Sequence, residues 1–311
     1  MTRIFRLLGC IFLPFMIACE PPEDMRPDRP PPPESGIQFE MPEAIIPAYS
    51  EIQLCWVPDW QRDADLFIKS FDPYQGPAGH HLVALSSMIP RAPGDTWDCT
   101  SIEDMVALNP LVFPNLSDRE ILPDGYGVRL GRYDTVVMQS HFVNATDHDI
   151  LVSDIANVIT VPDQEVDSDM IESSYIVVNR NDLNLAPGID DTYVDAALDI
   201  PHPINLLFFF GHMHDYGAKL HISVKRAIND FMTEEIYGID QWSGEMRDAP
   251  PFEFYDEGYS IVMEPGDRVH IECVFNNETG ETLHFPQEMC TGIGGYWPAL
   301  DEGTIILKEE E

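Results

Sequence analysis

The apolar runs constrain the fold of this chain more than any other feature of its sequence. From Glu51 onward they are short and rich in β-branched and aromatic residues, as at positions 52–56, 135–138 and 206–210. Turn residues such as Pro265-Gly266-Asp267 bound them, a pattern typical of β-strands. The sequence has no long helical period and allows one short helix, Ser101 to Leu108, with Ser101 as its cap. We therefore expect an all-β protein.

The length of the chain suits about two domains. Its 311 residues are enough for two units that each bury a core. A boundary is expected in the acidic, unpatterned stretch from Asp163 to Ser174. The expected architecture is thus two consecutive antiparallel β-sandwiches, one over residues 48–165 and one over residues 166–311.

The first residues have the pattern of a targeting segment. Arg3 and Arg6 precede an apolar run from Leu7 to Ile17, which is too short for the roughly 20 residues that span a bilayer but fits a secretory signal. The run is followed by Ala18-Cys19, which resembles the lipobox of bacterial lipoproteins. That resemblance implies removal of residues 1–18, acylation of Cys19, and a place in the cell envelope with this lipid as the only membrane attachment. The alternative is an ordinary signal peptide.

A proline-rich segment follows the signal. Seven of the thirteen residues from Pro21 to Pro33 are proline, mixed with charged residues. Proline-rich segments of this kind are extended and partly polyproline-like. We therefore expect residues 19–47 to be a tether that links the anchor to the globular part.

The charge of the chain excludes one class of partner. The formal net charge is −37 at pH 7, whereas proteins that bind nucleic acid use Lys and Arg to neutralise phosphates. At 44% hydrophobic residues the chain is also too apolar for a disordered acidic polymer. We expect no nucleic-acid partner, and we interpret the acidity as a solubility feature.

The cysteines predict disulfides. Cys10 and Cys19 belong to the signal region, and the remaining four are Cys55, Cys99, Cys273 and Cys290. An even number of cysteines in an exported protein suggests two disulfides, although the sequence alone allows three pairings. Pairing within each half of the chain is the simplest of them.

The histidines fall into three groups that could bind a metal: His80-His81, His141 in a strand-like run, and His212-Met213-His214. Residues i and i+2 of a strand share a face, so His212 and His214 can converge on one ion. His80 and His81 would point to opposite faces unless they lie at a strand end or a bulge, or use different ring nitrogens. Each group alone is more typical of a polar surface than of a metal site. No ligand role is assigned to His148, His202, His221, His270 and His284.

Taken together and in chain order, these motifs resemble the ascorbate-dependent type II copper monooxygenases, the family of the peptidylglycine α-hydroxylating and dopamine β-monooxygenases. The similar segments are Gly79–Leu85, Val137–Phe142, Phe210–His214 and Glu288–Cys290. The resemblance covers most of the globular chain. It implies two jelly-roll-like sandwiches, with a copper site in each facing an interdomain cleft.

The resemblance also implies the ligands and the disulfides. The electron-transfer copper would be held by His80, His81 and His141, and the copper at which O₂ and substrate react by His212, His214 and Met289. Imidazole suits copper in both oxidation states and a thioether favours Cu(I), whereas zinc more usually recruits carboxylates or thiolates. Alone, Met289 would be interpreted as core filler. The implied disulfides are Cys55–Cys99 and Cys273–Cys290.

Some positions depart from the family pattern. Phe210 stands where the amidating enzyme has an arginine that grips the substrate carboxylate, and Thr291 and Ile293 replace its asparagine and tyrosine. Without that charge-assisted anchor we do not expect peptide amidation. Gln53 replaces a tyrosine near the first site, while Gln139 matches a glutamine there. The run from Phe208 to Phe210 could face an apolar substrate, but we favour a place in the core.

The expected function is therefore hydroxylation of a C–H bond in a small or apolar organic substrate. The reaction would use O₂, two copper ions per chain, and ascorbate or a similar external reductant, and the chain is expected to be a monomer. The alternative is a copper-binding surface lipoprotein without turnover, which the changes at Phe210 and Gln53 favour. A third, weaker interpretation is a structural β-sandwich protein without metal.

Overall fold

The computed structural model describes residues 21–87, 89–100, 108–113, 122–166, 169–228, 232–247, 249–255, 261–285, 287–300 and 304–306. Over these ranges the chain is built from strands, and the only helical elements are the 3₁₀ segments η1 (Asp163–Glu165) and η2 (Gly244–Arg247). The all-β prediction is confirmed. The short helix predicted from Ser101 lies outside the described residues up to Leu108, where a strand begins.

The first half of the chain forms a five-stranded sheet in the order β7-β4-β10-β6-β8. Its strands are β4 (Ser50–Trp56), β6 (Gly79–Ser87), β7 (Thr96–Asp98), β8 (Leu108–Val112) and β10 (Thr135–Asn144). A small three-stranded sheet consists of β1 (Glu23–Asp24), β11 (Ile150–Val152) and β3 (Ala44–Ile46).

A ten-stranded sheet runs through both halves. The first half supplies β2 (Gly36–Glu40), β5 (Leu66–Tyr74), β9 (Tyr126–Leu130) and β12 (Ile155–Thr160). The second half supplies β13 (Ile171–Arg180), β15 (Ile204–His212), β18 (Glu253–Phe254), β19 (Val262–Met263), β21 (Cys290–Trp297) and β22 (Ile305–Ile306). The two parts are joined where β13 pairs in parallel with β9.

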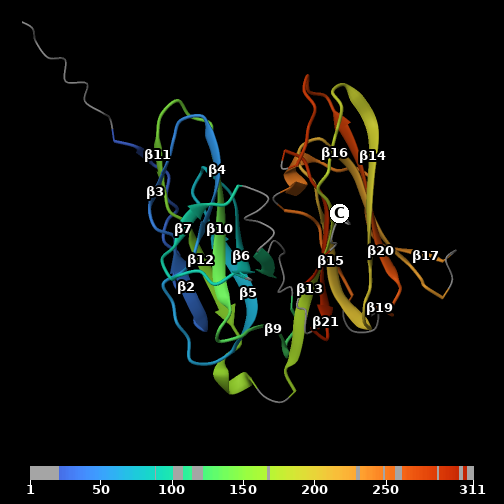
Figure 1. Ribbon diagram of the computed structural model, residues 1–311, viewed down its shortest axis with the longest axis horizontal. Helices are drawn as coiled ribbons and strands as arrows, with labels where there is room; N and C mark the ends of the chain where they lie inside the picture. Colours follow the sequence, from blue (N-terminus) through green and yellow to red (C-terminus); the bar gives the residue numbers. More distant parts are fainter. Residues whose placement is uncertain are drawn as a thin grey trace, which may run out of the picture.

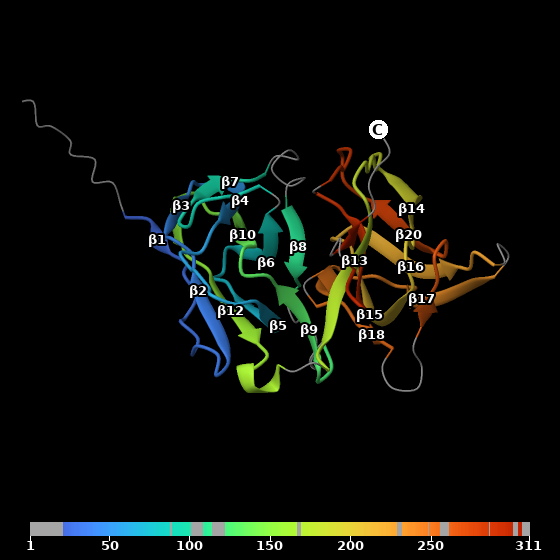
Figure 2. The same ribbon diagram turned by 60° about the horizontal axis from the view of Figure 1, so that its bottom comes forward.

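A four-stranded sheet, in the order β14-β20-β16-β17, completes the second half. It contains β14 (Ile189–Asp199), β16 (Gly217–Lys225), β17 (Thr233–Ile239) and β20 (Arg268–Asn277). Figures 1 and 2 show the early strands gathered in one lobe and the late strands in the other, with β9 and β13 between them.

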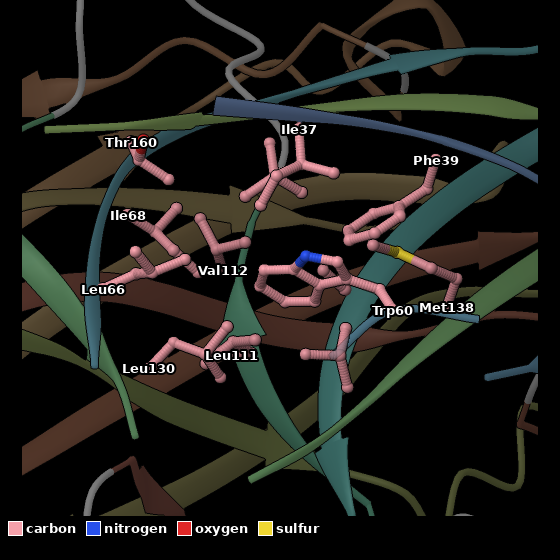
Figure 3. A pocket seen from close by; sticks show the side chains of 13 residues that line it. Ile37, Phe39, Trp60, Leu66, Ile68, Leu111, Val112, Leu130, Met138 and Thr160 are labelled. Atoms are coloured by element: carbon pink, nitrogen blue, oxygen red, sulfur yellow. The ribbon is translucent and has the colours of Figure 1, made fainter. Parts of the chain in front are cut away.

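Each lobe buries apolar side chains between two sheets. In the first lobe, side chains of β2, β5, β9 and β12 meet those of β6, β8 and β10 around Trp60, and the space left between them is only about 10 Å³ (Figure 3). In the second lobe, a Cβ added at Gly292 of β21 would meet Ile222 of β16 and Ile271 of β20. Phe208, Phe209 and Phe210 are 0%, 0% and 3% exposed, so the expectation that this run belongs to the core is confirmed.

The predicted tether needs correction, because residues 23–46 carry three strands. β2 pairs with β12 at the edge of the ten-stranded sheet, and β1 and β3 flank β11. The physical reason is a short apolar pattern after the prolines, which places Phe39, Met41 and Ile46 at 6%, 2% and 1% exposure. The composition of the proline-rich stretch concealed this pattern.

The two cysteine pairs are bonded within each half. Cys55 in β4 is joined to Cys99, and Cys273 in β20 is joined to Cys290 at the start of β21. Residues 1–20, which include the signal, Cys10 and Cys19, lie outside the described part of the chain. Within the described part, no helix is long and apolar enough to cross a membrane.

Candidate metal centre

The first histidine group is assembled by the register of two neighbouring strands. His141 of β10 lies opposite His81 of β6, and the next residue, Phe142, lies opposite Gly79. His80 is therefore the extra residue of a β-bulge at the start of β6. This is one of the three ways in which adjacent histidines were expected to share a metal. The bulge turns both side chains toward His141.

The three rings turn their Nδ1 atoms toward one another. The Nδ1 atoms of His80 and His81 are 3.1 Å apart, and those of His141 and His81 are 3.4 Å apart. One nitrogen of each ring lies within 4.8 Å of the others. Among the described residues, this is the one cluster of three or more His, Cys, Asp or Glu side chains placed to hold a metal ion.

Hydrogen bonds on the far side of the rings favour this arrangement. The His141 Nε2–H donates to Glu51 Oε1 at 2.8 Å, which leaves the lone pair of His141 Nδ1 to face the other rings. The Gln139 side chain also acts on the His81 ring, because it opposes the lowering of the pKa of His81. Sequence reasoning identified Gln139 but missed Glu51, although Glu51 precedes Gln53 by two residues and shares its face of β4.

Burial keeps these imidazoles in the form that binds a metal. It lowers the pKa of His81 well below its usual value, and the neighbouring rings of His141 and His80 lower it further. Burial also lowers the pKa of His141, although Glu51 opposes this shift. Neutral imidazole is the metal-binding form, so the cluster is prepared for a cation at neutral pH.

Gln53 is the residue that replaces a tyrosine in the resemblance to the copper monooxygenases. It lies opposite His141 in the pairing of β4 with β10 and is 7% exposed. Within the described part of the chain, its buried Oε1 has no hydrogen-bond partner. An unpaired buried acceptor on the strand next to His141 is consistent with a site that a bound metal and its water ligands would complete.

The second histidine group lies at the end of a strand. His212 is the last residue of β15, and His214 follows the fully buried Met213. The two Nε2 atoms are 3.2 Å apart, as expected for side chains on one face. The His214 Nδ1–H donates to the Gln287 carbonyl at 3.0 Å, which leaves Nε2 for a metal. Burial lowers the pKa of His214.

The buried carboxylate of Glu288 holds this strand end in place. Its Oε2 accepts hydrogen bonds from the backbone N–H groups of His214 and Met289, at 2.9 and 3.2 Å, and its Oε1 accepts one from Tyr216 at 2.7 Å. Burial raises the pKa of Glu288 to about 7, against the effect of these donors. The sequence motif included Glu288, but its role was missed because only the fold brings it beneath the histidines.

The same contacts place Met289 beside the second group. His212 lies opposite Thr291 in the antiparallel pairing of β15 with β21, so Met289 and His214 come next to each other just beyond the paired residues. Met289 is partly buried. Its backbone and that of His214 donate to the same oxygen of Glu288.

The two groups lie next to each other. The rings of His80 and His214 are 5.9 Å apart, centroid to centroid, with planes at 78°. The His80 ring is also 4.7 Å from that of His141. The sequence had suggested one site in each of two domains, and the structure brings both sets of histidines to one place between the lobes.

Four of the five remaining histidines contact carboxylates or a backbone carbonyl. His148 contacts Glu23 and Asp147, His221 contacts Glu235 and Asp240, and His270 contacts Asp195. The ring of His284 donates to the carbonyl of Leu183. These contacts agree with the absence of a predicted ligand role.

Phe210 does not face a substrate space. Its ring stacks on Phe252 at 4.4 Å and lies 6.4 Å from those of Phe113 and Phe208. The residue that stands in place of the family's arginine is thus part of the core.

Neither the family models nor the curated proteins contain a match to this chain. Its function is therefore inferred from the residues of the centre.

Proposed function

We propose that this protein is a copper-dependent monooxygenase. It would hydroxylate a C–H bond of an organic substrate with O₂ and an external reductant similar to ascorbate. The observation that carries the proposal is the convergence of the predicted histidines into two groups of ring nitrogens, the first of which joins His81 to His141, 60 positions away in sequence.

The donor atoms fit copper. Three neutral imidazoles suit either oxidation state, and two imidazoles with the thioether of Met289 suit Cu(I). Two of the five rings also form a hydrogen bond through the nitrogen that faces away from the other rings, His141 with Glu51 and His214 with the Gln287 carbonyl. Such bonds are usual for metal-bound histidine. Copper bound there would supply the one-electron chemistry and the activation of O₂.

The chain itself would position these groups. Glu51 fixes the tautomer of His141. Glu288 fixes the backbone around His214 and Met289. A charged anchor for the substrate is missing at Phe210, which packs in the core, so we infer a substrate recognised by apolar contact and not through a carboxylate.

The architecture and location belong to the same proposal. We infer two jelly-roll-like sandwiches that join along β9 and β13 and carry one copper site each. The first ends near residue 165 and includes the strands of residues 23–46, and the second covers residues 166–311. Cys19 would be acylated and hold the protein in the cell envelope. A Cys19→Ser variant should then be released from membranes and take up no labelled acyl chain, whereas an unlabelled wild type would refute the lipid anchor.

The first test is metal content. Wild-type protein loaded with copper and dialysed should retain close to two ions per chain, and His141→Ala should lose one of them. A wild-type value of zero or one contradicts the proposal. His202→Ala is the matched control, because His202 is an exposed histidine to which no ligand role is assigned.

Turnover separates the two candidate functions. A copper-binding lipoprotein without activity is favoured by the packing of Phe210, which leaves no substrate anchor at that position. Copper-loaded protein with ascorbate should consume O₂ faster when extracts containing its substrate are added. Two bound coppers without any such increase would favour the binding protein.

A further inference from the structure

The contact between the two histidine groups goes beyond the expectation of one site in each lobe. His80 is the residue that touches both groups. Its Nδ1 lies 3.1 Å from that of His81, and its ring is 5.9 Å from the ring of His214. Imidazole rings at such a distance leave no room for a layer of side chains between the two groups.

Separate elements hold the two sides of this contact. His80, His81 and His141 belong to the five-stranded sheet of the first lobe. His212 ends β15 of the ten-stranded sheet. That sheet continues from one lobe into the other through the pairing of β9 with β13, so backbone hydrogen bonds fix the lobes beside the centre.

We propose that the five histidines form a single two-copper centre, in which the unpaired electrons of two Cu(II) ions interact. This inference rests on the proposed function, since it requires both sites to bind copper. Ions held by ring nitrogens of His80 and His214 would be joined by the contact of those rings. Two sites isolated from each other would need protein or solvent between the rings.

Carboxylates near the centre would offset the charge of two ions held by neutral ligands. Glu51 accepts the hydrogen bond of His141, and Glu288 lies beneath His214. Arg247 and Asp215, which lie 3.8 Å from each other, act on the pKa of His214 in opposite directions, Arg247 lowering it and Asp215 raising it.

Electron paramagnetic resonance of the copper-loaded protein tests this inference. His141→Ala and His214→Ala should each retain one Cu(II), and the sum of their spectra is the reference for ions that do not interact. The doubly loaded wild type should depart from this sum, either by losing intensity or by showing a half-field transition, which an isolated Cu(II) ion cannot give.

The outcomes separate this inference from the proposed function. Two bound ions whose spectrum equals the sum, without a half-field transition, would overturn the single centre and leave the copper sites intact. Fewer than two bound ions in the wild type would overturn both. The half-field transition and the ratio of spin intensity to bound copper are both measured on the wild type alone, so a variant that fails to fold does not remove the test.

Discussion

The two histidine groups of the centre are built in different ways, although both present imidazole nitrogens. The group in the first lobe lies within a sheet, where the pairing of β6 with β10 and one bulge bring three rings together. The group in the second lobe lies beyond the end of β15, where backbone pairing has ceased. Regular sheet geometry can thus assemble one site, and the other needs a separate device.

A buried carboxylate supports each group. One carboxylate contacts a histidine through an intervening side chain, and the other contacts a histidine directly. Asp154 and Glu288 are both 0% exposed. Asp154 accepts from Gln75 Nε2 at 2.8 Å, and the same nitrogen contacts the carbonyl of His81 at 3.1 Å. Glu288 instead accepts directly from the backbone of His214. We therefore expect the second group to be more sensitive to loss of its carboxylate.

The largest expected effect comes from Glu288→Ala. It leaves three partly buried N–H groups without their acceptor, and an unsatisfied buried donor costs about 1–3 kcal/mol, or about 3–9 kcal/mol for three. Because these groups are only partly buried, we expect a loss in the lower part of that range, about 3–5 kcal/mol in the free energy of unfolding, measured by urea denaturation of copper-free protein. Copper bound at the second site should be lost, while the first site keeps its ion.

Glu288→Gln is the matched variant, because one amide oxygen can still accept from His214 and Met289. It should retain most of the stability and part of the second site. Equal loss of both copper ions in Glu288→Ala would contradict the expectation that the second group depends more on Glu288 than the first group does.

Asp154→Asn tests the supporting carboxylate of the first lobe through its pH dependence. Burial raises the pKa of Asp154 to about 6 from 3.8, so the folded protein holds this proton more tightly than the unfolded chain. Stability from this group is present below about pH 4 and is lost as the pH rises through about 6. The variant should lack this loss, which amounts to about 3 kcal/mol.

The measurement is urea unfolding of both proteins between about pH 4 and pH 7. Wild type should lose stability relative to Asp154→Asn across that window. Asp59→Asn, at an exposed aspartate, removes a titratable group without this burial and should stay parallel to wild type. Parallel curves for Asp154→Asn as well would contradict the assignment.

Met289→Leu tests the difference in ligand type between the two groups, since only the second group is expected to contain sulfur. Leucine keeps the volume and removes the thioether, which favours Cu(I). Cuprous affinity of the second site should fall at least tenfold, or about 1.4 kcal/mol, with the first site unchanged. Competition with a cuprous chelator measures both. Wild-type cuprous affinity in this variant would exclude Met289 as a ligand.

A stability measurement separates this result from simple packing. Swaps that conserve side-chain volume usually cost less than about 1.5 kcal/mol, so the copper-free Met289→Leu protein should melt close to wild type. Met289→Ala would instead add the cost of a cavity.

The sequence predicted the strands, the pairing of cysteines within each half and the shared face of His212 and His214 from local patterns. The grouping of His141 with His80 and His81 came instead from the resemblance to the copper monooxygenases. The period of two places His212 and His214 on one face, and their Nε2 atoms are 3.2 Å apart. The bulge at His80 was one of the stated possibilities. Such features depend on residues close in sequence or on a motif that several residues define together.

What the sequence could not predict depends on how separate elements pack. The contact of His80 with His214 needs both lobes to be placed. The role of Glu288 needs its side chain to lie under the end of β15. The strands within residues 23–46 were missed because proline content dominated the interpretation, although Phe39 and Ile46 are buried.

The smallest expected effect is that of Glu51→Ala, which tests whether the first group depends on any single supporting contact. Glu51 fixes the His141 tautomer, but its side chain is 59% exposed, so water can replace its oxygen. Losses for partners of metal-bound histidine are about 10–100-fold, and we expect about tenfold or less here. The measurement is copper affinity in a His212→Ala background, where only the first site remains.

Glu278→Ala, at an exposed glutamate of the second lobe, controls for the lost charge. Equal losses in Glu51→Ala and Glu278→Ala would mean that charge alone is responsible. A much larger loss in Glu51→Ala would mean that the first group, like the second, depends on one carboxylate.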